Sequence, residues 1–201
     1  MFELKHITKI FSRGTPDEKR ALNDLSLILN DGDFVTVIGG NGAGKSTMQN
    51  VISGAQTPEE GQVLLDGKPL PERGYSPVQM IYQHPEQAVN PRLRMRNVFE
   101  EGDQVETELI KKLGIEHDWM NRFPTELSGG ELQRFCIARA LGKRTRFLLA
   151  DEISTMLDLI TQSQIWHFLM EETQRRGIGM IVVSHSPELV EKVCTRVVEL
   201  K

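Results

Sequence analysis

Short apolar runs alternate with amphipathic stretches along the chain, and this rhythm is typical of strands and helices that take turns around a mostly parallel sheet. Residues 22–29 alternate apolar and polar side chains, which predicts a half-buried strand. After a turn rich in Asn, Asp and Gly, the apolar run at 34–39 predicts a fully buried strand. A glycine-rich loop follows, and residues 45–53 predict a helix that completes a strand, loop and helix unit.

The middle of the chain changes from strands to helices. Residues 63–67 and 78–83 predict two further strands, and the proline and glycine residues at 67–77 exclude a helix between them. From about residue 94 to residue 142 the apolar positions recur with a helical period. We therefore expect a helical subdomain over about 94–142, inserted into the core that carries the sheet.

The last third of the chain predicts a second strand, helix and strand unit. Residues 146–152 and 178–185 are continuous apolar runs of the length of core strands, and residues 162–176 between them are amphipathic. The whole chain, 1–201, is therefore expected to form a single domain. Its core is expected to comprise 1–93 and 143–201.

Composition and charge exclude several classes of protein. No apolar run among the 201 residues approaches the ~20 that a membrane-spanning helix needs, and the N-terminus lacks the apolar core of a signal peptide. Lys and Arg number 24 against 28 Asp and Glu, a net charge of -4, so no global positive field exists to hold nucleic acid. We expect a cytoplasmic protein that binds no nucleic acid.

The two cysteines, Cys136 and Cys194, lie far apart in the sequence, and no CxxC motif is present. This spacing argues against a zinc site and against a disulfide framework. We expect both cysteines to act as small buried apolar side chains.

The strongest motif for chemistry is GGNGAGKS at residues 39–46, which matches GxxxxGK[ST] and lies between a predicted strand and a predicted helix. Its glycines let backbone N–H groups converge on phosphate oxygens. Lys45 can then reach the β- and γ-phosphates, and the Ser46 hydroxyl can bind Mg²⁺. The candidate nucleotide-binding residues of this P-loop are Gly39, Asn41, Gly42, Ala43, Gly44, Lys45, Ser46 and Thr47. A glycine-rich turn without a ligand is the alternative, and the flanking strand and helix disfavour it.

Two acidic residues follow a predicted core strand. The sequence FLLADE places Asp151 at the carboxyl end of that strand, where ligands of α/β sheets gather, and Glu152 comes next. Asp151 suits a Mg²⁺ partner acting through water, and Glu152 can orient or polarise an attacking water. Taken alone, two acids at a strand end are equally well explained as the start of a helix.

A third motif, LSGGE at residues 127–131, changes the interpretation, because together with the other two it resembles the signature of the ATP-binding cassette (ABC) family. The resemblance covers about residues 2–200. Further matches, in chain order, are Phe11 at the aromatic that stacks on adenine, Gln83 at the Q-loop, Asp158 at the D-loop and His185 at the switch histidine.

The resemblance implies an α/β fold with a P-loop NTPase core of the RecA-like type and a mostly parallel sheet. An N-terminal antiparallel β subdomain and an inserted α-helical subdomain complete this expected fold. In the family two cassettes pair head to tail, so that the P-loop of one chain and the signature of the other enclose each ATP. The implied partners are a second ABC ATPase chain and transmembrane permease subunits, whose coupling helix meets the segment after Gln83. This assembly would hold the chain on the cytoplasmic face of a membrane.

The resemblance also implies roles for single residues. Ser128, Gly129 and Gly130 are expected to bind the ATP of the partner chain, since backbone N–H groups at a helix start form an anion site. An ordinary helix cap is the alternative for these three taken alone. The other implied roles are contacts of Gln83 with Mg²⁺ and the attacking water, a hydrogen bond of His185 to the γ-phosphate, general-base catalysis by Glu152 and a nucleotide contact by Asp158.

The chain departs from the family pattern at several positions. The usual DEPTSALD is DEISTMLD here, so Ile153 and Met156 replace a proline and an alanine. The loss of the proline is expected to loosen the chain after Glu152. Glu131 stands where glutamine is more usual, and Phe11 stands for tyrosine. We also expect a minimal cassette, because relatives normally continue beyond RVVELK.

Different parts of the chain resemble different subfamilies. Residues 83–92 and 123–134 resemble the ATPases of oligopeptide and nickel importers, whereas the first third resembles cassettes of the amino-acid uptake type. Natural drift is one hypothesis for this mixture, and a recombined or designed chain is the other. The leading functional hypothesis is the ATP-hydrolysing subunit of a transporter, with import favoured by the subfamily resemblance. The alternatives are a soluble ABC protein acting on ribosomes or DNA, and a scaffold with weak or no ATPase activity.

Overall fold

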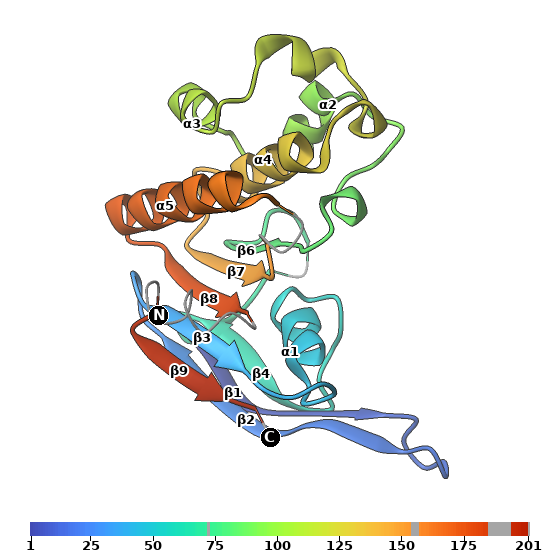
Figure 1. Ribbon diagram of the computed structural model, residues 1–201. Coiled ribbons are helices and arrows are strands. Elements are labelled where there is room, and N and C mark those ends of the chain that lie inside the picture. Colours follow the sequence, from blue (N-terminus) through green and yellow to red (C-terminus); the bar gives the residue numbers. More distant parts are fainter. Residues whose placement is uncertain (72, 154–156, 185–193, 201) are drawn as a thin grey trace.

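Two β-sheets and the helices around them make up the computed structural model, which describes residues 1–71, 73–153, 157–184 and 194–200 (Figure 1). The larger sheet is parallel throughout and has the order β6-β7-β8-β3-β9. Its strands are β3 (Phe34–Ile38), β6 (Val78–Ile81), β7 (Phe147–Asp151), β8 (Gly179–Val183) and β9 (Arg196–Glu199). The fold is therefore of the α/β class that the sequence predicted.

The smaller sheet is antiparallel and has the order β2-β1-β4-β5. Its strands are β1 (Phe2–Phe11), β2 (Lys19–Leu29), β4 (Glu60–Leu65) and β5 (Lys68–Pro69). β1 and β2 form a long hairpin that runs past the main sheet (Figure 1). The antiparallel β subdomain implied by the family resemblance is present.

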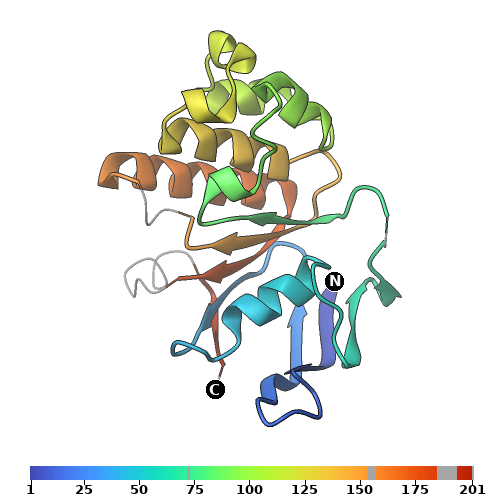
Figure 2. The same ribbon diagram turned by 90° about the vertical axis from the view of Figure 1, so that its right-hand side faces the viewer.

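Helices cover the parallel sheet on both faces (Figures 1 and 2). The helices of the structure are α1 (Lys45–Ile52), α2 (Met95–Glu100), α3 (Thr107–Lys112), α4 (Gly129–Ala140) and α5 (Leu159–Arg176). α1 lies on one side of the sheet and α4 and α5 on the other, whereas α2 and α3 lie beyond α4, away from the sheet (Figure 1). The short 3₁₀ turns are Pro85–Gln87, His117–Asn121 and Pro124–Glu126. α2, α3 and α4 lie within the range predicted to be helical. No helix among the described residues is long and apolar enough to cross a membrane.

The central strands show why the sequence carries unbroken apolar runs. In β7, Leu148 and Ala150 pack with α4 and α5, whereas Phe147 and Leu149 pack on the other side with α1 and the antiparallel sheet. Both faces of the strand are thus buried, and each Leu contributes ~1.5–3 kcal/mol of burial free energy. Burial on two faces removes the alternation that a half-exposed strand would show.

Three strands, β1, β5 and β9, had no element predicted for them, and local geometry explains the case of β1. In β1, Phe2 and Leu4 are buried, but the next buried apolar residue is Ile7, because a bulge at His6 shifts the alternation by one. His6 has a φ of 52°, and its Nδ1 lies 2.6 Å from Oδ1 of Asp24. Among the residues that the structure describes, β9 is a short edge strand whose one partner is β3.

The cysteines differ in their surroundings. Cys136 is buried in α4, and desolvation raises the pKa of its thiol to about 11. Cys194 is half-buried, and burial raises its pKa as well. Both thiols are therefore neutral at ordinary pH, and Cys136 packs as a small apolar group.

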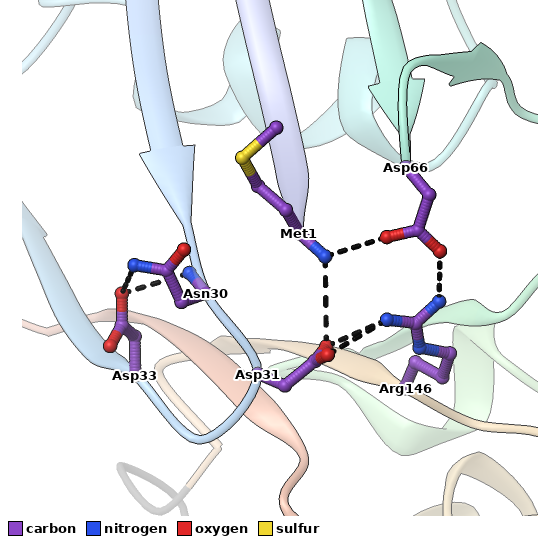
Figure 3. A network of polar contacts seen from close by, with 6 residues as sticks. All are labelled: Met1, Asn30, Asp31, Asp33, Asp66 and Arg146. Carbon is purple, nitrogen blue, oxygen red and sulfur yellow. Dashed lines mark hydrogen bonds and ion pairs between the residues drawn. The ribbon is translucent and has the colours of Figure 1, made fainter.

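A network of charges joins the two sheets at the edge where β7 begins (Figure 3). One guanidinium nitrogen of Arg146 lies 2.9 Å from both carboxylate oxygens of Asp31, and Arg146 also bonds to Asp66. The amino group of Met1 donates to Asp66 at 2.7 Å. Arg146 and this ammonium lower the pKa of Asp66 to about 2. The network therefore connects the turns after β2 and β4 to the start of β7.

Candidate functional site

A cavity of about 330 Å³ opens at the carboxyl ends of β3, β6, β7 and β8, the edge where ligands bind in parallel α/β sheets. We call it the P-loop cavity. Its lining residues are Phe11, Lys19, Ala21, Asn41, Gly42, Gly44, Lys45, Ser46, Thr47, Gln49, Gln83, Asp151, Glu152 and Val183.

The P-loop closes tightly against the β1–β2 hairpin. Gly44 precedes α1 with a φ of 95°, and a Cβ at this position would lie 2.3 Å from the carbonyl oxygen of Ala21. Only glycine fits both the conformation and the space. The first turn of α1 follows directly, and its backbone N–H groups lack partners within the helix. The loop and helix start can therefore hold an anion.

Lys45 reaches back over the loop that precedes it. Its ammonium donates to the carbonyl oxygen of Gly39 at 2.7 Å and to that of Gly40 at 3.1 Å. Both acceptors are uncharged, so these contacts do not neutralise the positive charge. The charge can attract an anion in the cavity, as a P-loop lysine does.

The acidic side of the cavity comes from the ends of β6 and β7. Gln83 donates from Nε2 to Oε2 of Glu152 at 3.2 Å. Glu152 has a φ of 43°, and its backbone N–H donates to the carbonyl of Val183 at 3.0 Å. This left-handed conformation, uncommon for a residue other than glycine, turns the chain sharply after β7.

Three oxygen-bearing side chains meet on the wall of this cavity. Ser46 offers a hydroxyl, Gln83 a carboxamide and Asp151 a carboxylate. Mg²⁺ prefers hard oxygen ligands of these kinds and keeps several waters. The donor set therefore fits a magnesium ion bound together with phosphate groups.

Four lining residues were not anticipated from the sequence: Lys19, Ala21, Gln49 and Val183. Gln49 is 2% exposed, and its amide nitrogen has no hydrogen-bond partner among the residues that the structure describes. Lys19 and Ala21 come from the hairpin, whose approach to the P-loop is a tertiary contact. No local pattern in the sequence marks these positions.

The signature segment (residues 127–131) lies away from this cavity. The Ser128 hydroxyl accepts from the N–H of Glu131 at 3.3 Å, and the Glu131 carboxylate accepts from the N–H of Ser128 at 2.6 Å. This reciprocal pair is a capping box that fixes the start of α4. Glu131, the departure from the family pattern, thus completes the cap.

Asp158 caps the neighbouring helix α5 and does not line the cavity. It accepts from the backbone N–H groups of Ile160 and Thr161 at 3.1 and 3.0 Å. Hydrogen bonds from Thr161 hold the pKa of this carboxyl below its ordinary value. A Cβ at Gly130 would lie 3.7 Å from Leu157, so the starts of α4 and α5 adjoin on one surface.

The residues predicted for the site therefore divide into those that line the P-loop cavity and those that do not. Those that line the cavity are Phe11, Asn41, Gly42, Gly44, Lys45, Ser46, Thr47, Gln83, Asp151 and Glu152. Those that do not are Gly39, Ala43, Ser128, Gly129, Gly130 and Asp158. His185 and Met156 lie outside the described residues.

Comparison with known proteins gives consistent matches. The family model described as ABC transporter matches residues 22–155. The nickel import ATP-binding protein NikE of Escherichia coli K12 is 31% identical over 203 residues, an alignment that covers 92% of this chain and 76% of that protein. The probable peptide ABC transporter ATP-binding protein y4tS of Sinorhizobium fredii is 32% identical, with 89% and 56% covered. The alignment with NikE thus spans most of the first third of the chain as well as most of the later segments, the two parts that resemble different subfamilies.

Solved structures agree with this result. The dimeric structure of MJ0796, a bacterial ABC transporter cassette, has a TM-score of 0.83 at 28% identity and covers 100% of this chain and 94% of its own. CbiO1 of Clostridium perfringens, part of an ABC transporter complex, has a TM-score of 0.78 at 24% identity, with 100% and 84% covered, and supports the fold alone.

Proposed function

The chain belongs to the ABC transporter family as an ATP-binding subunit with ATPase activity, and we propose that it powers an importer as a head-to-tail dimer. One observation carries the dimer. The signature residues Ser128, Gly129 and Gly130 do not line the cavity that holds the P-loop. A second chain must therefore supply a signature segment if both elements are to contact one nucleotide. The dimeric structure of MJ0796 supports this assembly.

Import of nickel or peptides is the proposed transport reaction. NikE, a nickel import protein, and y4tS, a probable peptide transporter protein, support this class of solute. The solute itself would be selected by other subunits. In this assembly the chain lies on the cytoplasmic face of the membrane.

In the proposed mechanism the P-loop amides and Lys45 hold the phosphates of ATP. Magnesium, when bound, would neutralise charge on the β- and γ-phosphates, and Ser46, Gln83 and Asp151 would hold it. Glu152 accepts a proton from the attacking water. His185 hydrogen-bonds to the γ-phosphate, and Phe11 stacks on the adenine ring.

The permease is proposed to dock beside Gln83. A surface cavity of about 670 Å³ lies next to the chain that follows β6. Its lining includes Tyr82, Gln87 and Arg139, which come from that segment and from α4. A short helix of a membrane subunit seated there would contact both the end of β6 and the helical region, so nucleotide state and permease movement would be coupled.

Phosphate release with Mg-ATP, measured over a range of protein concentrations, tests the proposal. We expect activity per chain to rise with concentration, because the active site needs two chains, and to vanish in Lys45→Ala and Glu152→Gln. Concentration-independent activity would contradict the dimer. Nucleotide binding without hydrolysis in the wild type would instead favour the inactive scaffold, for which the replacements Ile153 and Met156 are the motivation.

A further inference from the structure

A second lysine faces the P-loop cavity from outside the loop. We propose that Lys19 binds the phosphate chain of the nucleotide. Lys19 lies on β2 of the β1–β2 hairpin, where it is paired with Phe11 of β1. The proposal rests on the nucleotide binding described above and assigns a phosphate ligand that belongs to none of the sequence motifs.

The hairpin places Lys19 and Phe11 on the same wall. Their Cα atoms are partners in the β1–β2 register, and both residues line the cavity. Side chains directly opposite each other in an antiparallel pair lie on the same face, about 5 Å apart. A ligand that stacks on the Phe11 ring therefore passes the Lys19 ammonium. Figure 1 shows the hairpin passing below α1, the helix that the P-loop precedes.

Lys19 also lies against the P-loop itself. Its Nζ is 3.8 Å from the point where a Cβ on Gly42 would stand. Gly42 is part of the loop whose amides converge on phosphate oxygens. The ammonium therefore lies over the phosphate-binding part of the cavity.

The ammonium has no hydrogen bond or ion pair with any residue in the part of the chain that the structure describes. Lys45, the other lysine that lines the cavity, instead bonds to the carbonyl oxygens of Gly39 and Gly40. The ionisable residues that line the cavity are Lys19, Lys45, Asp151 and Glu152. The two lysines and two acids give the cavity wall no net charge, and a bound triphosphate adds several negative charges. Lys19 supplies a cation that can approach these charges without first breaking an ion pair.

Arg20 provides a matched control on the same strand. Successive side chains of a strand point to opposite faces, and Arg20 does not line the cavity. Its guanidinium donates to Oδ1 of Asn23 at 2.9 Å. Replacing Arg20 removes the same net charge from the hairpin while leaving the cavity wall unchanged.

Calorimetric titration of the purified chain with ATP, ADP and adenosine tests the proposal, using wild type, Lys19→Ala, Lys19→Arg, Arg20→Ala and Lys45→Ala. We expect Lys19→Ala to weaken ATP binding about tenfold, the usual worth of one charge-assisted hydrogen bond. ADP should be affected less and adenosine not at all. Lys19→Arg should restore most of the affinity. The salt dependence of ATP binding should be smaller in Lys19→Ala than in wild type, since one phosphate contact is lost.

Equal ATP affinities for Lys19→Ala and Arg20→Ala would overturn the assignment, as would an equal loss of adenosine affinity, which would indicate a general effect on the hairpin. A wild type that binds ATP, with Lys45→Ala weakened and Lys19→Ala unchanged, would refute this inference alone. A wild type that binds no ATP would refute the proposed function as well.

Discussion

The side-chain amide of Gln83 donates to Oε2 of Glu152 at 3.2 Å, although the two residues lie 69 positions apart. The contact exists because β6 and β7 are adjacent parallel strands that end at the same edge. A glutamine two residues beyond one strand thereby meets an acid directly after the other. The pair links the segment proposed to touch the permease with the proposed general base.

Glu152→Gln is expected to lower ATP turnover by about a hundredfold or more, because the amide cannot accept the proton of the attacking water. Nucleotide affinity should change little, since the phosphate ligands stay in place. Phosphate release and ATP titration measure the two quantities on the same preparation. Turnover within tenfold of the wild type would rule out Glu152 as the base.

Gly44→Ala is expected to lower ATP affinity at least tenfold and to destabilise the fold by ~2 kcal/mol or more. Its Cβ would lie 2.3 Å from a backbone oxygen, and its φ is 95°. Gly40→Ala is the control, because a Cβ there meets nothing within 4 Å. Urea unfolding and ATP titration of both variants give the comparison. Similar behaviour of the two would contradict the close packing of Gly44 against β2.

Gln49→Met is expected to raise the free energy of unfolding by about 1 kcal/mol in the absence of nucleotide. The Gln49 amide nitrogen is buried and lacks a partner among the described residues, so an apolar side chain of similar shape removes a desolvation cost. Gln79→Met should have the opposite effect, because the amide of Gln79 donates to the carbonyl of Ser76 at 2.7 Å. Urea unfolding distinguishes them, and a loss of stability in Gln49→Met equal to that in Gln79→Met would disprove the argument.

The ion pairs of Asp66 should make stability depend on pH in the acid range. The pKa of Asp66 is lowered from 3.8 to about 2, so its folded-state carboxylate binds a proton less readily than in the unfolded chain. Its contribution is therefore fully present above pH ~4 and is lost as the pH falls through about 2.

Urea midpoints of wild type and Asp66→Asn between pH 6 and pH 2 test this dependence. The wild type should be the more stable at pH 6, and the difference should shrink towards pH 2. Added salt should reduce it at pH 6, since the groups are exposed. A difference that stays constant with pH would show that the charge of Asp66 is not the cause.

Much of the architecture follows from the sequence because its signals are local. The apolar runs at β3, β7 and β8 are continuous because these strands are buried on both faces, and the P-loop glycines lie beside one another in the chain. A strand is missed where a backbone irregularity interrupts the alternation of apolar and polar residues. In β1 the bulge at His6 shifts this alternation by one residue, so the sequence pattern does not predict the strand.

The sequence by itself determined the class of fold, the P-loop and the two acids at the end of β7, since each is encoded in a short segment of the chain. The tertiary structure alone decided that Lys19 and Gln49 line the P-loop cavity. The physical reason is that these positions depend on how separate elements pack, because the β1–β2 hairpin folds against the P-loop. The spacing of residues within one segment cannot predict a contact between two segments, so only the folded chain shows that Lys19 lies beside the P-loop.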